Sequence, residues 1–266
     1  MNQLREIIKN LLPKTLKYNY RLLRKYGKKK RLERAYAGNN VECLICGHQY
    51  RIFEPFKNIE NEKCTNCISM KRHRLLYKYL IEETNLFNKN SVKKRLLHFA
   101  PEKAFYDLFT KQSNIDYYPG DIEPTLYQFY RNTKINNVDI TNISFPDNYF
   151  DVILCNHVLE HIIKDKEAMA ELFRVLKKDG WGIFQVPIDF NREETYEDFS
   201  KITPEERYKA FGQVDHVRWY GNDYPKRLSQ AGFEVYDIRY TDQFSKEEKF
   251  RYGFPEEESV YLCRKK

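Results

Sequence analysis

The sequence alternates, from about residue 92 onward, between short apolar runs and segments in which apolar residues recur every three or four positions. Uninterrupted apolar runs predict buried strands, and the second pattern predicts helices with one buried face. Strands that alternate with helices favour a parallel sheet covered on both faces, so we expect an α/β fold. The expected strands are 94–99, about 116–120, about 135–139, 150–155, 181–187, 233–240 and about 258–264.

Helices are expected between these strands, from residue 101, at about 165–178 and at 222–231. Residues 188–220 show neither pattern, and we expect an irregular insert there. The last two strands should finish the sheet as a hairpin-like pair.

The first third of the chain has a different character. Leu4, Ile7, Ile8, Leu11 and Leu12 recur at helical spacing before Pro13, which predicts a short amphipathic helix. Residues 38–70 are turn-rich, and a helical pattern follows at 70–81. We therefore divide the chain into a basic helical arm at 1–37, a small module with a connecting helix at 38–82, and the α/β domain at 83–266.

Charge is concentrated in the arm. Residues 1–37 hold twelve Lys or Arg against two Glu, a balance of +10, while the whole chain carries +8, so the remainder carries about −2. A nucleic-acid-binding domain should show a basic face on its working surface, and the main body does not predict one. For the arm, docking on its own domain, attachment to an anionic membrane and contact with RNA all stay open.

Bulk composition places further bounds on the protein. With 266 residues, 41% of them hydrophobic, the chain can form one ordinary core and a small accessory module. It has no run of roughly 18 to 20 apolar residues, as a membrane-spanning helix needs. The first residues lack the apolar core and cleavage site of a signal peptide. We expect a cytoplasmic protein, with the inner membrane face as a place of peripheral attachment.

Four of the six cysteines form two C-x-x-C pairs, Cys43 with Cys46 and Cys64 with Cys67, separated by seventeen residues. Each pair can place two thiolates on one side of a tight turn, and two such turns give the tetrahedral sulfur shell that Zn²⁺ prefers. We predict a structural zinc site in a module like a zinc ribbon or treble clef. His48 and His73 are the fallback ligands, and four unmetallated buried cysteines are the alternative.

The ends of the expected strands carry the candidate ligand-binding residues, because ligands of open α/β sheets bind beyond the carboxyl ends of the strands. Asp121 follows the second strand, about 20 residues after the first turn, where a carboxylate can accept hydrogen bonds from both hydroxyls of a ribose. A carboxylate and an apolar side chain after the third strand could meet an adenine. The four strand ends read HFAPE at 98–102, YPGDI at 118–122, VDI at 138–140 and CNHVLEH at 155–161.

In these motifs the sequence resembles class I S-adenosylmethionine-dependent methyltransferases, above all in FDVILCNHVLEHI followed by ELFRVLKKDGWGIFQVP. The resemblance implies a Rossmann-like, seven-stranded, mostly parallel sheet with S-adenosylmethionine as cofactor. Carried over by position, it assigns cofactor contacts after the first, second, third and fourth strands. These residues are Phe99, Ala100 and Glu102, then Asp121 and Ile122, then Asp139 and Ile140, then Asn156 and His157.

The first of these motifs departs from the E/D-x-G-x-G pattern of most of the family, since both glycines are missing. The methyl donor has no phosphate to bind, so a dense set of free backbone amides is not required. Ala100 is small enough for close approach, Pro101 suits the first position of a helix, and Glu102 suits its positive end or the cofactor's ammonium group. A decayed loop that no longer binds cofactor is the alternative.

Methyl transfer to a hydroxyl needs alignment of donor and acceptor and removal of a proton. His157, His161 and His216 are the candidate bases, because histidine can accept a proton at neutral pH, and we favour His216. It lies in the insert, which should close over the site and bind the acceptor. The candidate acceptor-binding residues are Arg218, Trp219 and Tyr220 of the insert, with Arg72 and Arg74 near the cysteine module.

The cysteine module followed by RHRLL and HFAPE resembles a zinc-bearing subgroup of these methyltransferases, often found in bacterial assembly of cell-surface polysaccharides. The leading hypothesis is therefore an O-methyltransferase that acts on a saccharide or another small polar acceptor in glycan biosynthesis. An RNA methyltransferase that grips RNA through the zinc module and the arm is the second hypothesis. The third is a non-catalytic interaction protein anchored by zinc.

Overall fold

The structure, a computed structural model, describes residues 30–90, 92–127 and 134–266, and it divides into two compact units. The first unit holds the described residues up to Arg74 together with Ser245–Phe254, and the second holds Leu75–Phe244 and Pro255–Lys266. Helix α3 (Lys71–Glu82) crosses the division. The amphipathic helix expected in the basic arm lies outside the described residues, except that residues 30–35 are helical. None of the helices in the described ranges has the length and apolar character needed to cross a bilayer.

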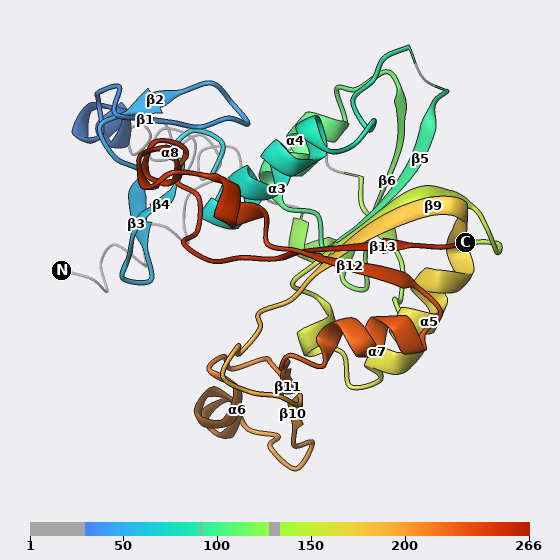
Figure 1. The fold of residues 1–266 in the computed structure, drawn as a ribbon. Helices are drawn as coiled ribbons and strands as arrows, with labels where there is room; N and C mark the ends of the chain where they lie inside the picture. The colour runs from blue at the N-terminus through green and yellow to red at the C-terminus, as the bar shows by residue number, and fades with distance from the viewer. Residues whose placement is uncertain (1–29, 91, 128–133) are drawn as a thin grey trace, which may run out of the picture. The chain divides into compact units, whose positions relative to one another are not determined.

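The second unit is built on a seven-stranded sheet with the strand order β12-β13-β9-β8-β5-β6-β7 (Figure 1). All strands run parallel except β13, which pairs antiparallel with both β9 and β12. The expected fold is thus confirmed, although the third expected strand is reduced to two residues. The strands are β5 (Lys94–Phe99), β6 (Ile115–Asp121), β7 (Asn136–Asn137), β8 (Phe150–Asn156), β9 (Leu176–Gln185), β12 (Glu234–Ile238) and β13 (Val260–Arg264).

Helices cover both faces of this sheet. Helix α4 (Lys103–Phe109) lies on one face, and α5 (Asp165–Val175) and α7 (Tyr224–Gln230) lie on the other (Figure 1). Ala168, Leu172 and Val175 recur on one side of α5 and are fully buried in the core against the sheet. This spacing, which places residues on one face of a helix, is the physical origin of the helical pattern in the sequence.

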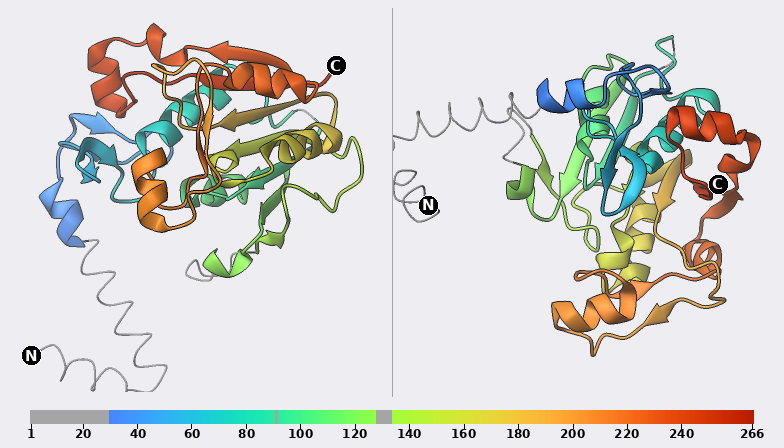
Figure 2. Two further views of the ribbon diagram at one scale, coloured as in Figure 1. Left: turned by 90° about the horizontal axis from the view of Figure 1, so that it is seen from below. Right: turned by 90° about the vertical axis from the view of Figure 1, so that its left-hand side faces the viewer.

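The segment 188–220 is more regular than the sequence predicts. It contains β10 (Tyr196–Glu197), α6 (Pro204–Phe211) and β11 (Arg218–Trp219), and β10 pairs with β11. These elements form a small layer of their own at one end of the second unit (Figure 2), and we call residues 188–220 the insert. Helix α6 begins with a capping box between Thr203 and Glu206 and with proline in its first turn. These start signals were present in the sequence, so the expectation of an irregular segment was wrong.

The first unit is a pair of hairpins completed by a helix from the far end of the chain. Its elements are β1 (Val41–Glu42), β2 (Gln49–Tyr50), β3 (Glu54–Phe56), β4 (Ile59–Lys63) and α8 (Lys246–Tyr252). Arg74 is fully buried over the ring of Phe53, 4.0 Å from its centroid, and donates to the backbone carbonyls of Ser69, Glu62, Tyr252 and Gly253. One buried guanidinium therefore ties the cysteine segment to residues 245–254.

Candidate functional site

The strand register brings the predicted cofactor residues to one edge of the sheet. Phe99 pairs with Gly120 on one side and with Cys155 on the other. Asp121 is in register with Asn137, and Asn156 with Gln185. The chain leaves β5 towards β6 and leaves β8 towards β9, in opposite directions, so the edge between β5 and β8 is the topological switch point at which open sheets bind ligands.

In the loop after β5, Ala100 adopts the backbone conformation that a glycine would usually supply. Ala100 has a φ of 44°, in the left-handed region that glycine adopts without strain, and its N–H donates to the carbonyl of Gly120 at 3.0 Å. Non-glycine residues in this region are uncommon and cluster at functional sites. The loop therefore keeps the backbone conformation of a glycine turn, with a methyl group as the only addition.

Glu102 is held by a residue that the sequence reasoning did not assign. Its Oε2 lies 2.8 Å from Nε2 of His98, and Nδ1 of His98 lies 2.9 Å from the hydroxyl of Tyr117. His98 is fully buried, with its ring edge-on to both Phe105 and Phe109 of α4. The contact with His98 fixes the direction of the Glu102 carboxylate. The spacing of four residues between His98 and Glu102, across the turn, was the sequence feature that could have indicated this contact.

Asp121, the predicted ribose ligand, is oriented by two local hydrogen bonds. Its Oδ1 accepts from the N–H of Glu123 at 2.8 Å, and its Oδ2 accepts from the hydroxyl of Tyr127 at 2.7 Å. Each carboxylate oxygen can accept a further bond, so the group can still receive a diol. Ile122 beside it is 65% exposed and offers an apolar surface at the same edge.

The two candidate cofactor-binding residues after β7 differ in exposure. The carboxylate of Asp139 is exposed and accepts from the N–H and the hydroxyl of Thr141, both at 2.8 Å. Ile140 is buried in the core next to Val138 and Ile143. The structure thus places Asp139 at the surface of the edge and Ile140 beneath it.

Asn156 ends β8 with an unsatisfied side chain. The residue is 5% exposed, and neither its Oδ1 nor its Nδ2 has a hydrogen-bond partner among the described residues. Buried polar groups in proteins are rarely left without partners, and an exception calls for an explanation such as a ligand. His157 follows with a φ of 54°, its N–H bound to the carbonyl of Gln185 at 2.7 Å.

The three candidate bases converge just beyond Asn156. His157 precedes the one-turn helix η2 (Leu159–His161), His161 is its last residue, and His216 reaches them from the insert. The rings of His161 and His216 meet edge to face with centroids 4.8 Å apart. Nδ1 of His157 lies 3.3 Å from Oε1 of Glu160, which is 1% exposed. Burial lowers the pKa of His216 below its usual value, so its imidazole is neutral at pH 7.

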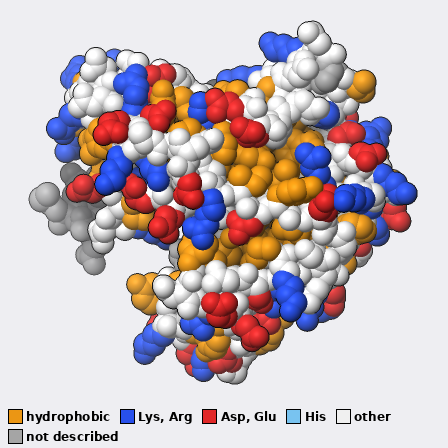
Figure 3. Space-filling view, viewed as in Figure 1, with side chains coloured by type: hydrophobic (Ala, Val, Ile, Leu, Met, Phe, Trp, Pro, Cys, Tyr) orange, Lys and Arg blue, Asp and Glu red, His pale blue; other side chains and the backbone are white. Residues whose placement is uncertain are grey.

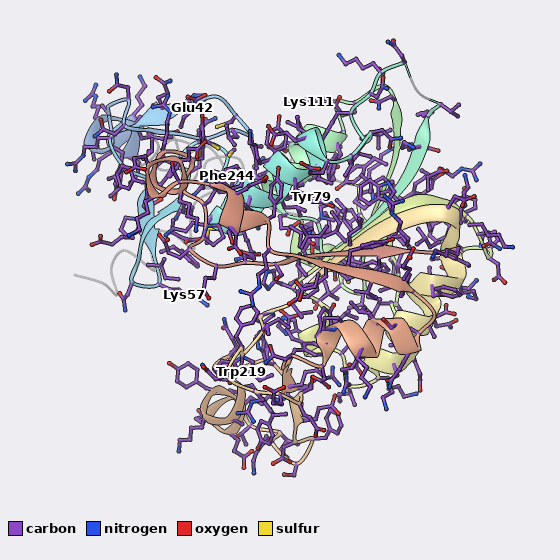
Figure 4. All side chains as sticks on the ribbon, viewed as in Figure 1. Glu42, Lys57, Tyr79, Lys111, Trp219 and Phe244 are labelled. Atoms are coloured by element: carbon purple, nitrogen blue, oxygen red, sulfur yellow. The ribbon has the colours of Figure 1, made fainter. Side chains whose placement is uncertain are left out.

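The insert residues proposed for acceptor binding have different surroundings. Arg218 is fully buried and donates to Glu197 and to the carbonyls of Leu159, Ile162 and Ile163. Tyr220 is fully buried, and its hydroxyl donates to Asp165 at 2.8 Å. Trp219 is only half-buried, on β11 beside α6 (Figure 4). Of the three, Trp219 has the surface to meet a ligand.

The other two arginines proposed for acceptor binding lie in the first unit. Arg74 uses its guanidinium on backbone carbonyls, as described above. Arg72, two residues earlier on α3, is half-buried, and its Nε has no partner among the described residues. Arg72 is thus the freer of the two.

The four cysteines of the first unit form one cluster. Their sulfur atoms all lie within 4.8 Å of one another, with 3.5 Å between Cys43 and Cys67 and 3.7 Å between Cys46 and Cys64. Four thiolates at about 2.3 Å from a zinc ion in a tetrahedron are about 3.8 Å apart, so the cluster has the dimensions of such a shell.

Backbone geometry and acidity agree with a metal-binding role for the cysteines. Gly47 (φ 71°) and Ile68 (φ 58°) close the two turns in the left-handed region, which a β-branched residue such as Ile68 adopts only at a cost. The neighbouring Cys43 thiol lowers the pKa of Cys64 to about 7, while hydrogen bonding to Cys46 raises that of Cys43. Four such sulfurs cannot all ionise side by side without a cation, so the donor set fits Zn²⁺.

Residues 103–184 match a family model described as a methyltransferase domain. The match begins at α4 and ends in β9, and it includes Asp121, Asn156 and the η2 turn. A search of curated proteins gives no match to the sequence.

Solved structures with a similar fold include a chain from the complex of the Haloferax volcanii Trm112 methyltransferase activator with a methyltransferase (14% identity, 73% of this chain, 90% of that chain, TM-score 0.47). Another is described as an S-adenosylmethionine-dependent methyltransferase of Listeria monocytogenes (16% identity, 73% and 100%, TM-score 0.47). A third is the 1,6-didemethyltoxoflavin-N1-methyltransferase of Burkholderia thailandensis (15% identity, 68% and 74%, TM-score 0.44). Structural similarity at this level of identity does not identify the methyl acceptor of this chain. The family match covers the second, third and fourth strand-end motifs but not HFAPE at 98–102, and it supports the S-adenosylmethionine-dependent methyltransferase that the sequence predicts.

Proposed function

We propose that the second unit binds S-adenosylmethionine at the edge formed by β5, β6 and β8 and transfers its methyl group to a hydroxyl of a small polar acceptor. The observation that carries the proposal is the buried, unpartnered amide of Asn156. It lies at the same edge as the glycine-like Ala100 and the oriented carboxylate of Asp121. A ligand with amino, carboxylate and diol groups would satisfy these polar atoms together.

The histidines beyond Asn156 supply what a hydroxyl acceptor needs. The methyl group leaves the sulfonium as the acceptor oxygen attacks in line, and the oxygen must lose its proton. A neutral His216 can take that proton, and His157 and His161 are the other candidates. Trp219 offers a flat apolar face of the kind that packs against a sugar ring, which supports a saccharide acceptor of glycan biosynthesis.

The charge distribution does not favour RNA as the acceptor. Outside residues 1–37 the chain carries about −2, and basic and acidic side chains are interspersed over the face seen in Figure 3. An RNA-binding surface would need clustered Lys and Arg, with binding that weakens steeply as salt rises. Tight, salt-sensitive RNA binding would reverse this preference.

Two further parts of the proposal concern the rest of the chain. The four cysteines would hold a zinc ion, which would be structural because four protein ligands leave no open coordination position for chemistry. Binding of the ion would stabilise the small first unit. The basic arm would attach the protein to an anionic membrane surface at the inner face, where saccharide intermediates on lipid carriers would be reached. Zinc content and vesicle binding test these parts.

Isothermal titration of the full chain with S-adenosylhomocysteine, the inert product, tests the cofactor site. Asp121→Ala should weaken binding at least about tenfold, since about 1–3 kcal/mol is expected from losing hydrogen bonds to a charged group. Asp116→Ala, at the other end of β6, is the matched control and should bind normally. Equal affinity in Asp121→Ala would remove this residue from the site, and no heat with the unaltered chain would favour the non-catalytic alternative.

Transfer of labelled methyl groups identifies the acceptor. Cell extracts are separated into glycan, lipid and RNA fractions and incubated with the enzyme and labelled S-adenosylmethionine. Label in the glycan or lipid-linked saccharide fraction is expected. Label confined to RNA would overturn the proposed acceptor while leaving the methyltransferase assignment intact.

A further inference from the structure

Glu160, His161 and His216 form a second group of potential metal ligands, separate from the cysteines. One ligand atom from each of the three lies within 4.8 Å of the other two. Two of the residues belong to the η2 turn after β8, and the third comes from the insert, more than fifty positions further along the chain. The fold, rather than local sequence, has brought them together.

Glu160 contributes a carboxylate with one unsatisfied oxygen to this group. The residue is 1% exposed, and its Oε2 has no hydrogen-bond partner among the described residues, while Oε1 faces Nδ1 of His157 at 3.3 Å. A buried carboxylate is costly unless its charge is paired or coordinates a metal. His157 can satisfy only one of the two oxygens, so a cation near Oε2 would account for the other.

The two imidazoles are prepared as ligands. Nδ1 of His161 lies 3.1 Å from the backbone carbonyl of Asp215 and 3.5 Å from its carboxylate. A proton on that nitrogen leaves the lone pair of Nε2 available, which is the arrangement by which outer carboxylates and carbonyls orient metal-binding histidines. His216 is 7% exposed and makes no hydrogen bond through its ring in the described part of the chain.

The positions of the ligands are fixed by the surrounding contacts. The N–H of Val217 donates to the carbonyl of Glu160 at 3.0 Å and joins the insert to the η2 turn. Arg218, the next residue, donates to three carbonyls in and just after the same turn, at Leu159, Ile162 and Ile163. The two residues that follow His216 thus join the insert to the segment that carries Glu160 and His161, so the ligand set is held together without an ion.

From this arrangement we propose that Glu160, His161 and His216 bind one divalent transition-metal ion such as Zn²⁺. Two imidazoles and one carboxylate are a ligand set of catalytic zinc and non-haem iron sites, which keep coordination positions open for substrate. In the methyltransferase proposed above, an acceptor oxygen would occupy an open position, where its pKa would fall. With His161 and His216 bound to the ion, His157 would be the base that takes the proton. This role rests on the proposed function, whereas binding of the ion does not.

Zinc stoichiometry of the full chain tests the proposal. The purified chain and its variants are equilibrated with Zn²⁺, freed of excess ion and measured by elemental analysis. With the cysteine site filled, the unaltered chain should hold two zinc ions, and Glu160→Gln and His216→Ala should each hold one. Glu167→Gln, an exposed glutamate of α5, is the control and should hold two. Equal zinc content in all four proteins would overturn the proposal.

Three further measurements separate ligand loss from misfolding. With the cysteine site already filled, further Zn²⁺ should raise the melting temperature of the unaltered chain and of Glu167→Gln, but not that of Glu160→Gln. Before this addition, Glu160→Gln should melt no lower than the unaltered chain. The affinity of this site for zinc should fall at least about a hundredfold in Glu160→Gln and in His216→Ala. Even the loss of a residue that only hydrogen-bonds to a metal ligand lowers metal affinity by about ten- to a hundredfold. S-adenosylhomocysteine should bind Glu160→Gln normally. Loss of zinc with retained cofactor binding supports the site, and failure of cofactor binding in the unaltered chain overturns only the proposed function.

Discussion

Arg218 offers a direct comparison between a structural role and the acceptor-binding role that the sequence predicts for it. In Arg218→Met the side chain keeps its length but loses every donor. The backbone carbonyls of Leu159, Ile162 and Ile163 then lose their hydrogen bonds from the fully buried guanidinium. Glu197 and Asp165 keep their ion pairs with Arg227, at 2.7 and 2.8 Å. The η2 turn and the insert would no longer be joined by this group.

The expected loss of stability follows from these contacts. Removing one partner of a buried ion pair costs about 3–5 kcal/mol when a charge is left uncompensated. Because Arg227 remains paired with both carboxylates, the uncompensated groups are mainly the backbone carbonyls, at about 1–3 kcal/mol each when unsatisfied. We expect a loss of about 3–5 kcal/mol, a large part of a typical total of about 5–15 kcal/mol.

Urea unfolding measures this loss by fluorescence of the two tryptophans, Trp181 and Trp219, which both lie in the second unit. With a slope of about 2 kcal/mol per molar urea, the midpoint should fall by roughly 1.5–2.5 M. Arg264→Met, at an exposed position on β13, is the control and should change the free energy of unfolding by less than about 0.5 kcal/mol. A loss below about 1 kcal/mol in Arg218→Met, joined to a raised KM, would refute the structural role and favour acceptor binding.

Two further predictions concern the turn after β5 and an ion pair of α5. Ala100→Gly should raise the free energy of unfolding by about 0.5 kcal/mol, because the left-handed conformation costs alanine roughly 1–2 kcal/mol and glycine loses about 0.5–1 kcal/mol of extra entropy on folding. Urea midpoints check it against Ala104→Gly inside α4, which should lose at least about 1 kcal/mol; equal losses in both would show that residue 100 is unstrained. The Arg174 guanidinium lowers the pKa of Glu171, so this carboxyl stabilises the fold above its ordinary value of 4.5 and the benefit disappears as the pH falls through the lowered pKa. The urea midpoint of Glu171→Gln should accordingly lie further below that of the unaltered chain at pH 7 than at roughly pH 3.5, and a gap of constant size would contradict the sign of this linkage.

The sequence was informative where a contact depends on residues close together in the chain. Two C-x-x-C pairs on tight turns, with Gly47 closing the first, already predict the four-sulfur cluster, and apolar runs bounded by helical patterns already predict the parallel sheet. Ser245 and Glu248 form a capping box at the start of α8, a local signal that our reading of the sequence did not use. The sequence did not indicate which unit this helix completes.

Tertiary structure decided the contacts between residues distant in sequence. Whether Arg218 faces a ligand or the interior depends on where the η2 carbonyls lie, and whether His161 meets His216 depends on how the insert returns to β8. A periodic pattern records only which side of an element is buried, not which distant group it meets there. Backbone conformation also depends on tertiary contacts. Ala100 adopts the left-handed conformation typical of glycine because the pairing of β5 with β6 fixes the position of the Gly120 carbonyl to which its N–H donates. The sequence alone therefore predicted the strands of the sheet and the strand ends proposed to bind the cofactor, while packing determined which side chains there are buried or exposed.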